Sequence, residues 1–306
     1  MMRFLLRRTV WLLVVLVVVS ALVFVIFNVL PARNDAGFGA TSHGPVLARL
    51  WHFLERAFLH VDLGYAWDPP RAPVDDMVRA ALPATISLML GAMVLALAVG
   101  LPLGALCATR PRSVAARAAT FASVLMLCAP VYWLGLVLLR FFEPHIGVVR
   151  LPFIGGSGTY EPLTHDPVRW VESLLLPWVA LAVPLTGLII RMLTSSMKET
   201  WQEDYVRTSR AKGLSAAAVR RRALKPALPP VITLVGLNVA TFVSNVVLVE
   251  TVFGLPGIGE MARTSMENTD LPVVQGSVLA GAALVCAGSL LADAAQALLD
   301  PRVRLS

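Results

Sequence analysis

Residues 203–233 read EDYVRTSRAKGLSAAAVRRRALKPALPPVIT, a basic and polar stretch between two long apolar segments. A chain that spends so many polar residues on one loop offers a docking surface to a soluble partner. Residues from about 198 to 212 contain no Pro or Gly, which predicts a helix. Gly213 then provides the left-handed cap on which helices commonly end, and apolar Leu214 follows it. The first part of the loop is therefore predicted to be a helix that stops at a glycine.

A second short helix is predicted directly after this glycine. Ser215 is a favourable N-cap for residues 216 to about 224, and Pro226 is expected to end the helix. Two short helices hinged at Gly213 form a compact element that a partner can move as a unit. The basic residues Arg220, Arg221, Arg222 and Lys225 that follow are read as residues that only fix membrane topology.

Composition predicts that the whole chain lies in a membrane. Of 306 residues, 57% are hydrophobic and 15% are charged, and the mean hydropathy is +0.73, whereas soluble domains are about a quarter charged. Apolar runs of roughly 17–25 residues are long enough to cross a bilayer. Six such runs predict an all-α protein with six transmembrane helices, at residues 9–30, 83–107, 118–142, 174–193, 230–252 and 273–291.

The distribution of Lys and Arg predicts the orientation. Basic residues precede the first run, separate the second from the third, crowd the loop at 198–225 and end the chain, and six spans put all of them on one side. Positive charge marks the cytoplasmic side, so we expect a multi-pass membrane protein with both termini in the cytoplasm. The net charge of +7 then reflects topology and gives no reason to expect nucleic-acid binding.

The first apolar run is read as an uncleaved anchor. The alternative is a cleaved signal peptide, but the run exceeds the length of a signal core and no small-x-small site ends it. The cysteines Cys107, Cys128 and Cys286 lie in or beside apolar runs without paired spacing, so they predict neither a disulfide framework nor a metal site. The outer segments at 143–172 and 250–272 are rich in Pro and Gly, and the second suits a short re-entrant or surface helix.

Missing motifs exclude several functions. The chain has no GxxxxGK[ST] phosphate loop and no HExxH or paired CxxC motif, so we expect no catalytic residues, no bound metal and no bound cofactor. Carboxylates inside spans are what ion-coupled transporters use, and only Asp293 qualifies; we favour a helix-end or subunit-packing role for it over ion coupling. A transporter without an ion relay or an ATP site needs an external motor.

The fifth apolar run carries a polar stripe. Its polar residues recur at three- and four-residue spacing, which puts them on one helical face. This face lines a translocation pathway or forms interhelical hydrogen bonds in the bundle, and the sequence does not separate the two. The stripe consists of Asn238, Thr241, Ser244 and Asn245.

The chain resembles the permease subunits of binding-protein-dependent ABC importers, in the dipeptide, oligopeptide and nickel branch. The resemblance rests on DYVRTSRAKGLS (204–215) in the inner loop and on five further motifs, RFLLRR (3–8), ALPATISL (81–88), VETVFGLPGIGEM (249–261), LPVVQG (271–276) and ALLDPRVR (297–304). It departs from the family's pattern in the first outer loop, where the usual His-Gly-Asp-Leu-Gly reads His60-Val61-Asp62-Leu63-Gly64 and Leu30-Pro31 is not followed by Gly-Asp-Pro.

The resemblance implies a type I importer permease fold with a cytoplasmic coupling loop at about 198–229, in the cytoplasmic membrane of a bacterium or archaeon. Its domains are an anchor helix with its outer segment (1–81), a permease domain (82–299) and a cytoplasmic tail (300–306). The residues expected to couple to the ATPase are Asp204, Tyr205, Arg207, Arg210, Ala211, Lys212, Gly213, Leu214 and Ser215. Those expected at an extracytoplasmic gate are Glu250, Phe253, Pro256 and Gly257.

The implied partners are a homologous second permease in a heterodimer, two ATPase subunits that bind ATP and Mg²⁺, an extracytoplasmic substrate-binding protein, and the lipid bilayer. The chain is then a transport subunit and not an enzyme, and its cargo is expected to be peptides delivered by the binding protein. The alternatives are an ion-coupled secondary transporter subunit or, among ABC importers, a permease for nickel, glutathione or an antibiotic peptide.

Overall fold

The computed structural model describes residues 2–28, 45–68, 71–144, 147–149, 154–156 and 158–299, and the side chains within 7–26 and up to residue 297 at the two ends. Leu30 and Pro31, the predicted tail 300–306, the side chain of Arg3 and residues 150–153 lie outside this description. The described chain is helical and contains no β-strand, which confirms the all-α prediction. Its elements are α1 (Met2–Asn28), α2 (Val46–Glu55), the π-helical turn η1 (Arg56–His60), α3 (Val74–Thr109), α4 (Val114–Cys128), α5 (Val131–Phe142), α6 (Pro167–Gln202), α7 (Asp204–Ala211), α8 (Ala216–Leu237), α9 (Val239–Phe253), α10 (Ile258–Glu267) and α11 (Leu271–Leu299).

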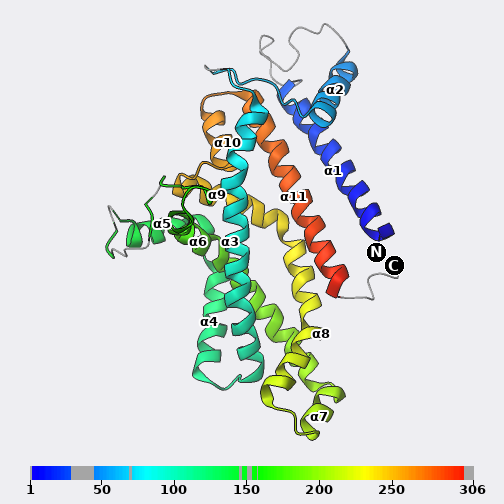
Figure 1. The fold of residues 1–306 in the computed structure, drawn as a ribbon, viewed down its shortest axis with the longest axis vertical. Coiled ribbons are helices and arrows are strands. Elements are labelled where there is room, and N and C mark those ends of the chain that lie inside the picture. Colours follow the sequence, from blue (N-terminus) through cyan, green and yellow to red (C-terminus); the bar gives the residue numbers. More distant parts are fainter. Residues whose placement is uncertain are drawn as a thin grey trace.

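Membrane spans of two kinds account for the six apolar runs. The unbroken helices α1, α3, α6 and α11 are each long and apolar enough to cross a bilayer. Each of the other two runs is a pair of helices with a bend between them, of 108° between α4 and α5 and of 56° between α8 and α9. The helices α1, α3 and α11 follow the long axis of the molecule, whereas α5 lies across it (Figure 1). The described residues therefore contain four helices that are long and apolar enough to span a membrane, or up to six such spans if each bent pair is one span.

The two longest helices begin at sequence signals that favour a helix start. Asp166 caps α6, and its carboxylate accepts from the amides of Val168 and Arg169 at 2.9 and 3.2 Å. Asp75 and Asp76 occupy the first turn of α3, where negative charge complements the helix dipole. Each helix has 36 residues, or roughly 54 Å at 1.5 Å per residue, so both extend beyond the roughly 30 Å hydrocarbon layer.

The core forms where α3 packs on α6. Small residues on α3 allow this close approach: Ala92 and Ala96 are fully buried, and a Cβ atom at Gly100 would lie 2.8 Å from the side chain of Ile189. Small residues replace the missing hydrophobic driving force between helices in lipid by permitting tight van der Waals contact. Trp178 of α6 also donates from Nε1 to the carbonyl of Ser87 at 3.0 Å. Movement of α6 must therefore be passed on to α3.

The first helix packs against the last one. Arg8 pairs with Asp293 at 2.5 Å between Nε and Oδ2, and Phe24, fully buried, contacts Phe53 of α2 with ring centroids 5.6 Å apart. Asp293 thus joins two helices of the same chain, and the subunit-packing role predicted for it stays a prediction. The predicted domain boundary at 81–82 falls inside α3, and the division itself stays a prediction.

Two predicted helix boundaries are wrong. The helix expected over 198–212 is interrupted at Glu203, which is extended (φ −64°, ψ 145°) between α6 and α7. The second loop helix does not end at Pro226, because α8 continues through Pro226, Pro229 and Pro230 to Leu237.

Candidate functional site

The inner loop is built as two helices joined by a well-defined cap. Gly213 has φ +73°, the amide of Gly213 donates to the carbonyl of Arg210 at 2.9 Å, and the amide of Leu214 donates to that of Ser209 at 3.3 Å. These bonds form the Schellman motif, in which the left-handed residue is usually glycine. The hydroxyl of Ser215 then accepts from the amide of Ala218 at 3.3 Å and caps α8. The predicted glycine cap and serine cap are confirmed.

One side of α7 is held by the protein and the other side is exposed. Val206 and Ser209 are buried, and Arg222 of α8 donates to the hydroxyl of Ser209 at 3.3 Å. Most of the predicted coupling residues lie on the exposed side, with Leu214 half-buried against the core: Asp204, Tyr205, Arg207, Ala211, Lys212, Gly213 and Ser215 are exposed. The loop therefore presents a continuous surface that is anchored from behind.

Two predicted contact residues are engaged within the chain. Arg207 forms an ion pair with Asp204 at 3.6 Å. The guanidinium of Arg210 lies 4.6 Å from the ring centroid of Trp201 at the end of α6. Arg210 thus stacks on its own chain, a placement that only the tertiary structure reveals.

The predicted polar stripe coincides with the bend between α8 and α9. Asn238 is the joint itself, and its side-chain amide donates to the carbonyl of Leu234 at 2.8 Å. Thr241 and Ser244 are exposed on α9, and Asn245 is half-buried, while the opposite face of α9 is buried. The stripe faces away from the core of this chain, and its role in the pathway stays a prediction.

At the opposite end, a buried carboxylate joins three helices. Glu250 of α9 is fully buried. Its Oε1 accepts from the hydroxyl of Thr85 on α3 at 2.7 Å, and its Oε2 accepts from the amide of Gly259 on α10 at 2.7 Å. The Thr85 oxygen also accepts from the amide of Ile258 at 2.9 Å. We call Glu250, Thr85, Ile258 and Gly259 the outer lock.

Glycines next to the outer lock leave room for the carboxylate. A Cβ atom at Gly257 would overlap the carboxyl group of Glu250, and one at Gly259 would come within 2.6 Å of the backbone of Val247. Phe253 is buried one turn after Glu250. The sequence predicted Glu250, Phe253, Pro256 and Gly257 as a gate but missed the hydroxyl of Thr85, for which the only signal was its place in the ALPATISL motif.

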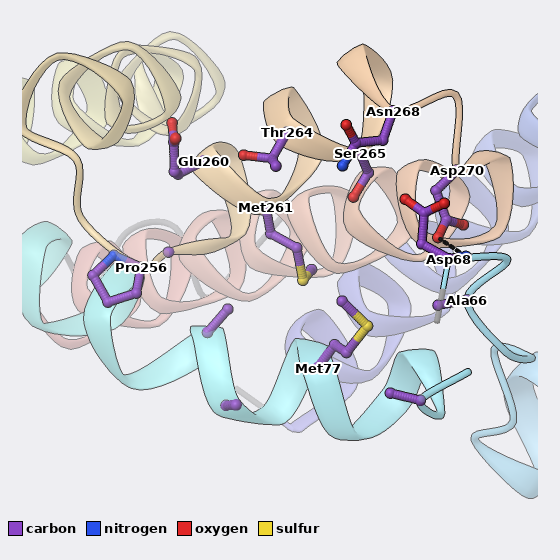
Figure 2. Close-up of a pocket in the computed structure, with 14 residues that line it drawn as sticks. Ala66, Asp68, Met77, Pro256, Glu260, Met261, Thr264, Ser265, Asn268 and Asp270 are labelled. Carbon is purple, nitrogen blue, oxygen red and sulfur yellow. Dashed lines mark hydrogen bonds between the residues drawn. The ribbon is translucent and has the colours of Figure 1, made fainter. Parts of the chain in front are cut away.

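A cavity of about 610 Å³ opens beside the lock, between the start of α3 and α10. Figure 2 shows Met77 of α3 and Met261 of α10 extending into the space between the two helices. Its polar residues are Asp68, Glu260, Thr264, Ser265, Asn268 and Asp270. The carboxylate of Asp270, next to the start of α11, accepts hydrogen bonds from the amides of Trp67 and Asp68 at 3.0 and 3.4 Å. These bonds fix the segment that precedes α3 to the start of α11.

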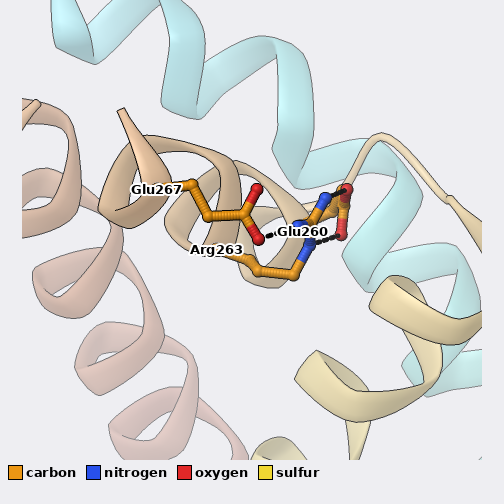
Figure 3. Close-up of polar contacts among 3 residues, drawn as sticks. All are labelled: Glu260, Arg263 and Glu267. Atoms are coloured by element: carbon orange, nitrogen blue, oxygen red, sulfur yellow. Dashed lines mark hydrogen bonds and ion pairs between the residues drawn. The ribbon is translucent and has the colours of Figure 1, made fainter. Parts of the chain in front are cut away.

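The exposed side of α10 is charged but balanced. Figure 3 shows Arg263 between Glu260 and Glu267, with its Nη2 2.5 Å from Oε1 of Glu260. The hydrogen bonds from Arg263 hold the pKa of the Glu260 carboxyl below its ordinary value. Glu260 and Glu267 lie three and four residues from Arg263, so one helical turn brings each carboxylate next to the guanidinium. The charges of α10 at the rim of the cavity are therefore paired within the helix.

Comparison with known proteins identifies the family. The sequence pattern of the family described as binding-protein-dependent transport system inner membrane component matches residues 100–305. The dipeptide transport system permease protein DppB of Escherichia coli (strain K12) is 30% identical, and the match covers 99% of each chain. The oligopeptide transport system permease protein AppB of Bacillus subtilis (strain 168) is 35% identical over 76% of this chain and 72% of its own length.

A third relative, the probable peptide ABC transporter permease protein y4tP of Sinorhizobium fredii, is 36% identical over 76% of this chain and 72% of its own. These matches overturn the alternative of an ion-coupled secondary transporter, and they agree with the prediction that the chain is a transport subunit without enzymatic activity. The family implies ATPase and binding-protein partners. The multi-pass helical chain described above belongs to the family of binding-protein-dependent transport system inner membrane components, the permease subunits of ABC importers.

Proposed function

We propose that this chain translocates peptides, which an extracytoplasmic binding protein delivers and two ATPase subunits drive across the membrane. The relatives' names point to peptide cargo, and the exposed two-helix loop is the observation that carries the mechanism. The chain pairs with a homologous second permease as a heterodimer. It binds no cofactor itself, and the ATPase subunits bind ATP and Mg²⁺.

The loop transmits force because one side of it is exposed to the ATPase subunits and the other side packs against the rest of the chain. Closure of the ATPase subunits pushes α7, whose residues Val206 and Ser209 are buried against the rest of the chain. α7 follows α6 after the single extended residue Glu203, and α6 packs along α3. A movement of the loop therefore reaches both long spans.

The outer lock converts tilting of α3 into movement of α10. Thr85 of α3 is bonded both to Glu250 and to the start of α10, so these elements move together. α10 lies beside the cavity (Figure 2), and its displacement opens or closes the extracytoplasmic end. The stripe of Asn238, Thr241, Ser244 and Asn245 lines the pathway between the two ends.

Orientation follows from charge. The loop end of the molecule carries an excess of Arg and Lys, and positive charge favours the cytoplasmic side. We therefore place α7, the turn between α3 and α4, and both termini in the cytoplasm, and α10 on the outer side.

The test uses two substitutions at Gly213. Its φ of +73° strains a β-branched residue, whereas Asn tolerates this conformation, and no neighbouring atom lies within 4 Å of a Cβ there. We expect Gly213→Val to lose co-purification of the ATPase subunits and binding-protein-stimulated ATP hydrolysis, and Gly213→Asn to keep both. Unchanged activity of the correctly inserted Val variant refutes the coupling role.

Cargo is tested separately in proteoliposomes that contain the assembled transporter and its binding protein. We expect ATP-dependent uptake of labelled di- and oligopeptides. Uptake of Ni²⁺ or glutathione in the absence of peptide uptake assigns the other cargo and overturns the peptide proposal.

A further inference from the structure

A second cavity, of about 300 Å³, lies at the inner end of the molecule behind the loop. It is bounded by Thr109 and Arg110 at the end of α3, by Trp201 at the end of α6, and by Arg210, Ala216 and Arg220 from α7 and α8. Figure 1 shows the turn between α3 and α4 at the same end of the molecule as α7. The cavity thus lies between the ends of two spans and the loop.

The cavity is unusually cationic. Arg110, Arg210 and Arg220 all line it, and no acidic side chain in the described part of the chain does so. Each ion pair that the described residues form uses other basic residues. Three guanidinium groups that surround one space without a carboxylate repel one another and attract an anion.

The residues that line the cavity, three exposed arginines beside apolar side chains, favour a phosphate group attached to an apolar body. Arg binds phosphate through two parallel hydrogen bonds. Leu214, Val219 and the ring of Trp201 supply an apolar wall, and Arg210 is already positioned by stacking on this ring. Trp is enriched at the level of the lipid headgroups, and basic pockets between helices on the cytoplasmic side bind anionic headgroups.

We propose that this cavity binds the phosphate of an anionic phospholipid from the cytoplasmic leaflet, with Arg110, Arg210 and Arg220 as its ligands. Arg110 belongs to the end of α3, and Arg210 and Arg220 belong to the loop. The headgroup therefore bridges the loop and the core span. The assignment to the cytoplasmic leaflet rests on the orientation proposed above.

The test compares two triple variants of the full-length chain that remove equal charge. The cavity variant replaces Arg110, Arg210 and Arg220 by Gln, and the control variant replaces Arg112, Arg117 and Arg221, which do not line the cavity. Each chain is reconstituted with equal amounts of phosphatidylglycerol and phosphatidylcholine, and native mass spectrometry counts the lipids that remain bound. A hydrogen bond to a charged group contributes about 1.5 kcal/mol or more, which is about tenfold in affinity, so we expect the cavity variant to lose its preference for phosphatidylglycerol by at least roughly 100-fold. The control variant keeps all three cavity arginines, so we expect it to keep that preference.

Inorganic phosphate in excess distinguishes the source of the anion. Displacement of phosphatidylglycerol by inorganic phosphate from both the wild type and the control variant, which share the three cavity arginines, assigns the cavity to a soluble phosphate group and overturns the lipid proposal. Equal lipid binding by all three chains, or equal loss in both variants, overturns the proposal. So does loss of the lipid from the wild type once the ATPase subunits are bound, because the cavity is then part of the protein interface. None of these measurements requires transport, so their failure leaves the permease function intact.

Discussion

Replacing Thr85 by Val tests the outer lock with almost no change in side-chain volume. Thr85 is 2% exposed, and its hydroxyl donates to Glu250 at 2.7 Å and accepts from the amide of Ile258 at 2.9 Å. Val removes both bonds and leaves a buried carboxylate oxygen and a buried amide without this partner. Interhelical hydrogen bonds in membrane proteins contribute about 0.6 kcal/mol on average and at most about 1.7 kcal/mol, so the two bonds predict a loss of roughly 1–3 kcal/mol.

The matched control is Thr186→Val on α6. Thr186 is also buried, at 4% exposed, but its hydroxyl donates only to the carbonyl of Ala182 in its own helix at 2.8 Å. The loss of this bond removes no contact between helices. We therefore expect the free energy of unfolding to change by less than about 0.5 kcal/mol, as for substitutions that break no tertiary feature.

Both variants are compared with the wild type by thermal unfolding in the same lipid nanodiscs and by limited proteolysis. We expect Thr85→Val to lower the melting temperature well beyond Thr186→Val and to expose α10 to protease before the remaining helices unfold. If both variants melt alike and α10 stays protected, the outer lock does not hold α10 to α3, and the proposed coupling of α10 to the long spans is wrong.

Three further predictions concern residues outside the lock. Val61 has φ +54° and is 52% exposed. Glycine at this position relieves about 1–2 kcal/mol of left-handed strain and gives back about 0.4–1 kcal/mol because the unfolded chain becomes freer. We therefore expect Val61→Gly to raise the free energy of unfolding by roughly 1 kcal/mol, and a lower melting temperature contradicts this. A double-mutant cycle of Arg8→Gln and Asp293→Asn should give a coupling of about 0.2–1 kcal/mol, and zero coupling means that the pair does not form. Arg263 holds the pKa of the Glu260 carboxyl below its ordinary value of 4.5. This pair therefore stabilises the fold fully above pH 4.5 and loses its effect as the pH falls through the lowered pKa. In Arg263→Gln, the fall in the free energy of unfolding at acid pH should be less steep than in the wild type.

Features that depend on neighbouring residues could be predicted from the sequence. Gly213, Leu214 and Ser215 form the expected caps because a helix end is decided by a few adjacent backbone groups. The same local logic failed at Pro226, because α8 continues through this proline to Leu237. It also missed Glu203, which carries no signal of a helix break.

Features that depend on distant residues could not be predicted. Thr85 and Glu250 are 165 positions apart, and no periodicity within either segment pairs them. Arg210 likewise belongs to the exposed loop by sequence, and only the end of α6 brings Trp201 under it. The family motifs include the segments of Thr85 and Glu250, but they do not show that these two residues are in contact.

The bend of 108° between α4 and α5 has a consequence for how the chain is made. As it leaves the ribosome, the stretch from Val114 to Phe142 is one apolar segment long enough to span the membrane, whereas α5 alone, with 12 residues and roughly 18 Å in length, is too short. We expect the insertion machinery to admit it as a straight helix. Gly135 of α5 packs against Val252 and Phe253, and this packing becomes available only after α9 has been synthesised. We therefore expect the corner at Pro130 to be fixed by a late rearrangement inside the bilayer, and a chain truncated before α9 should keep its third span straight.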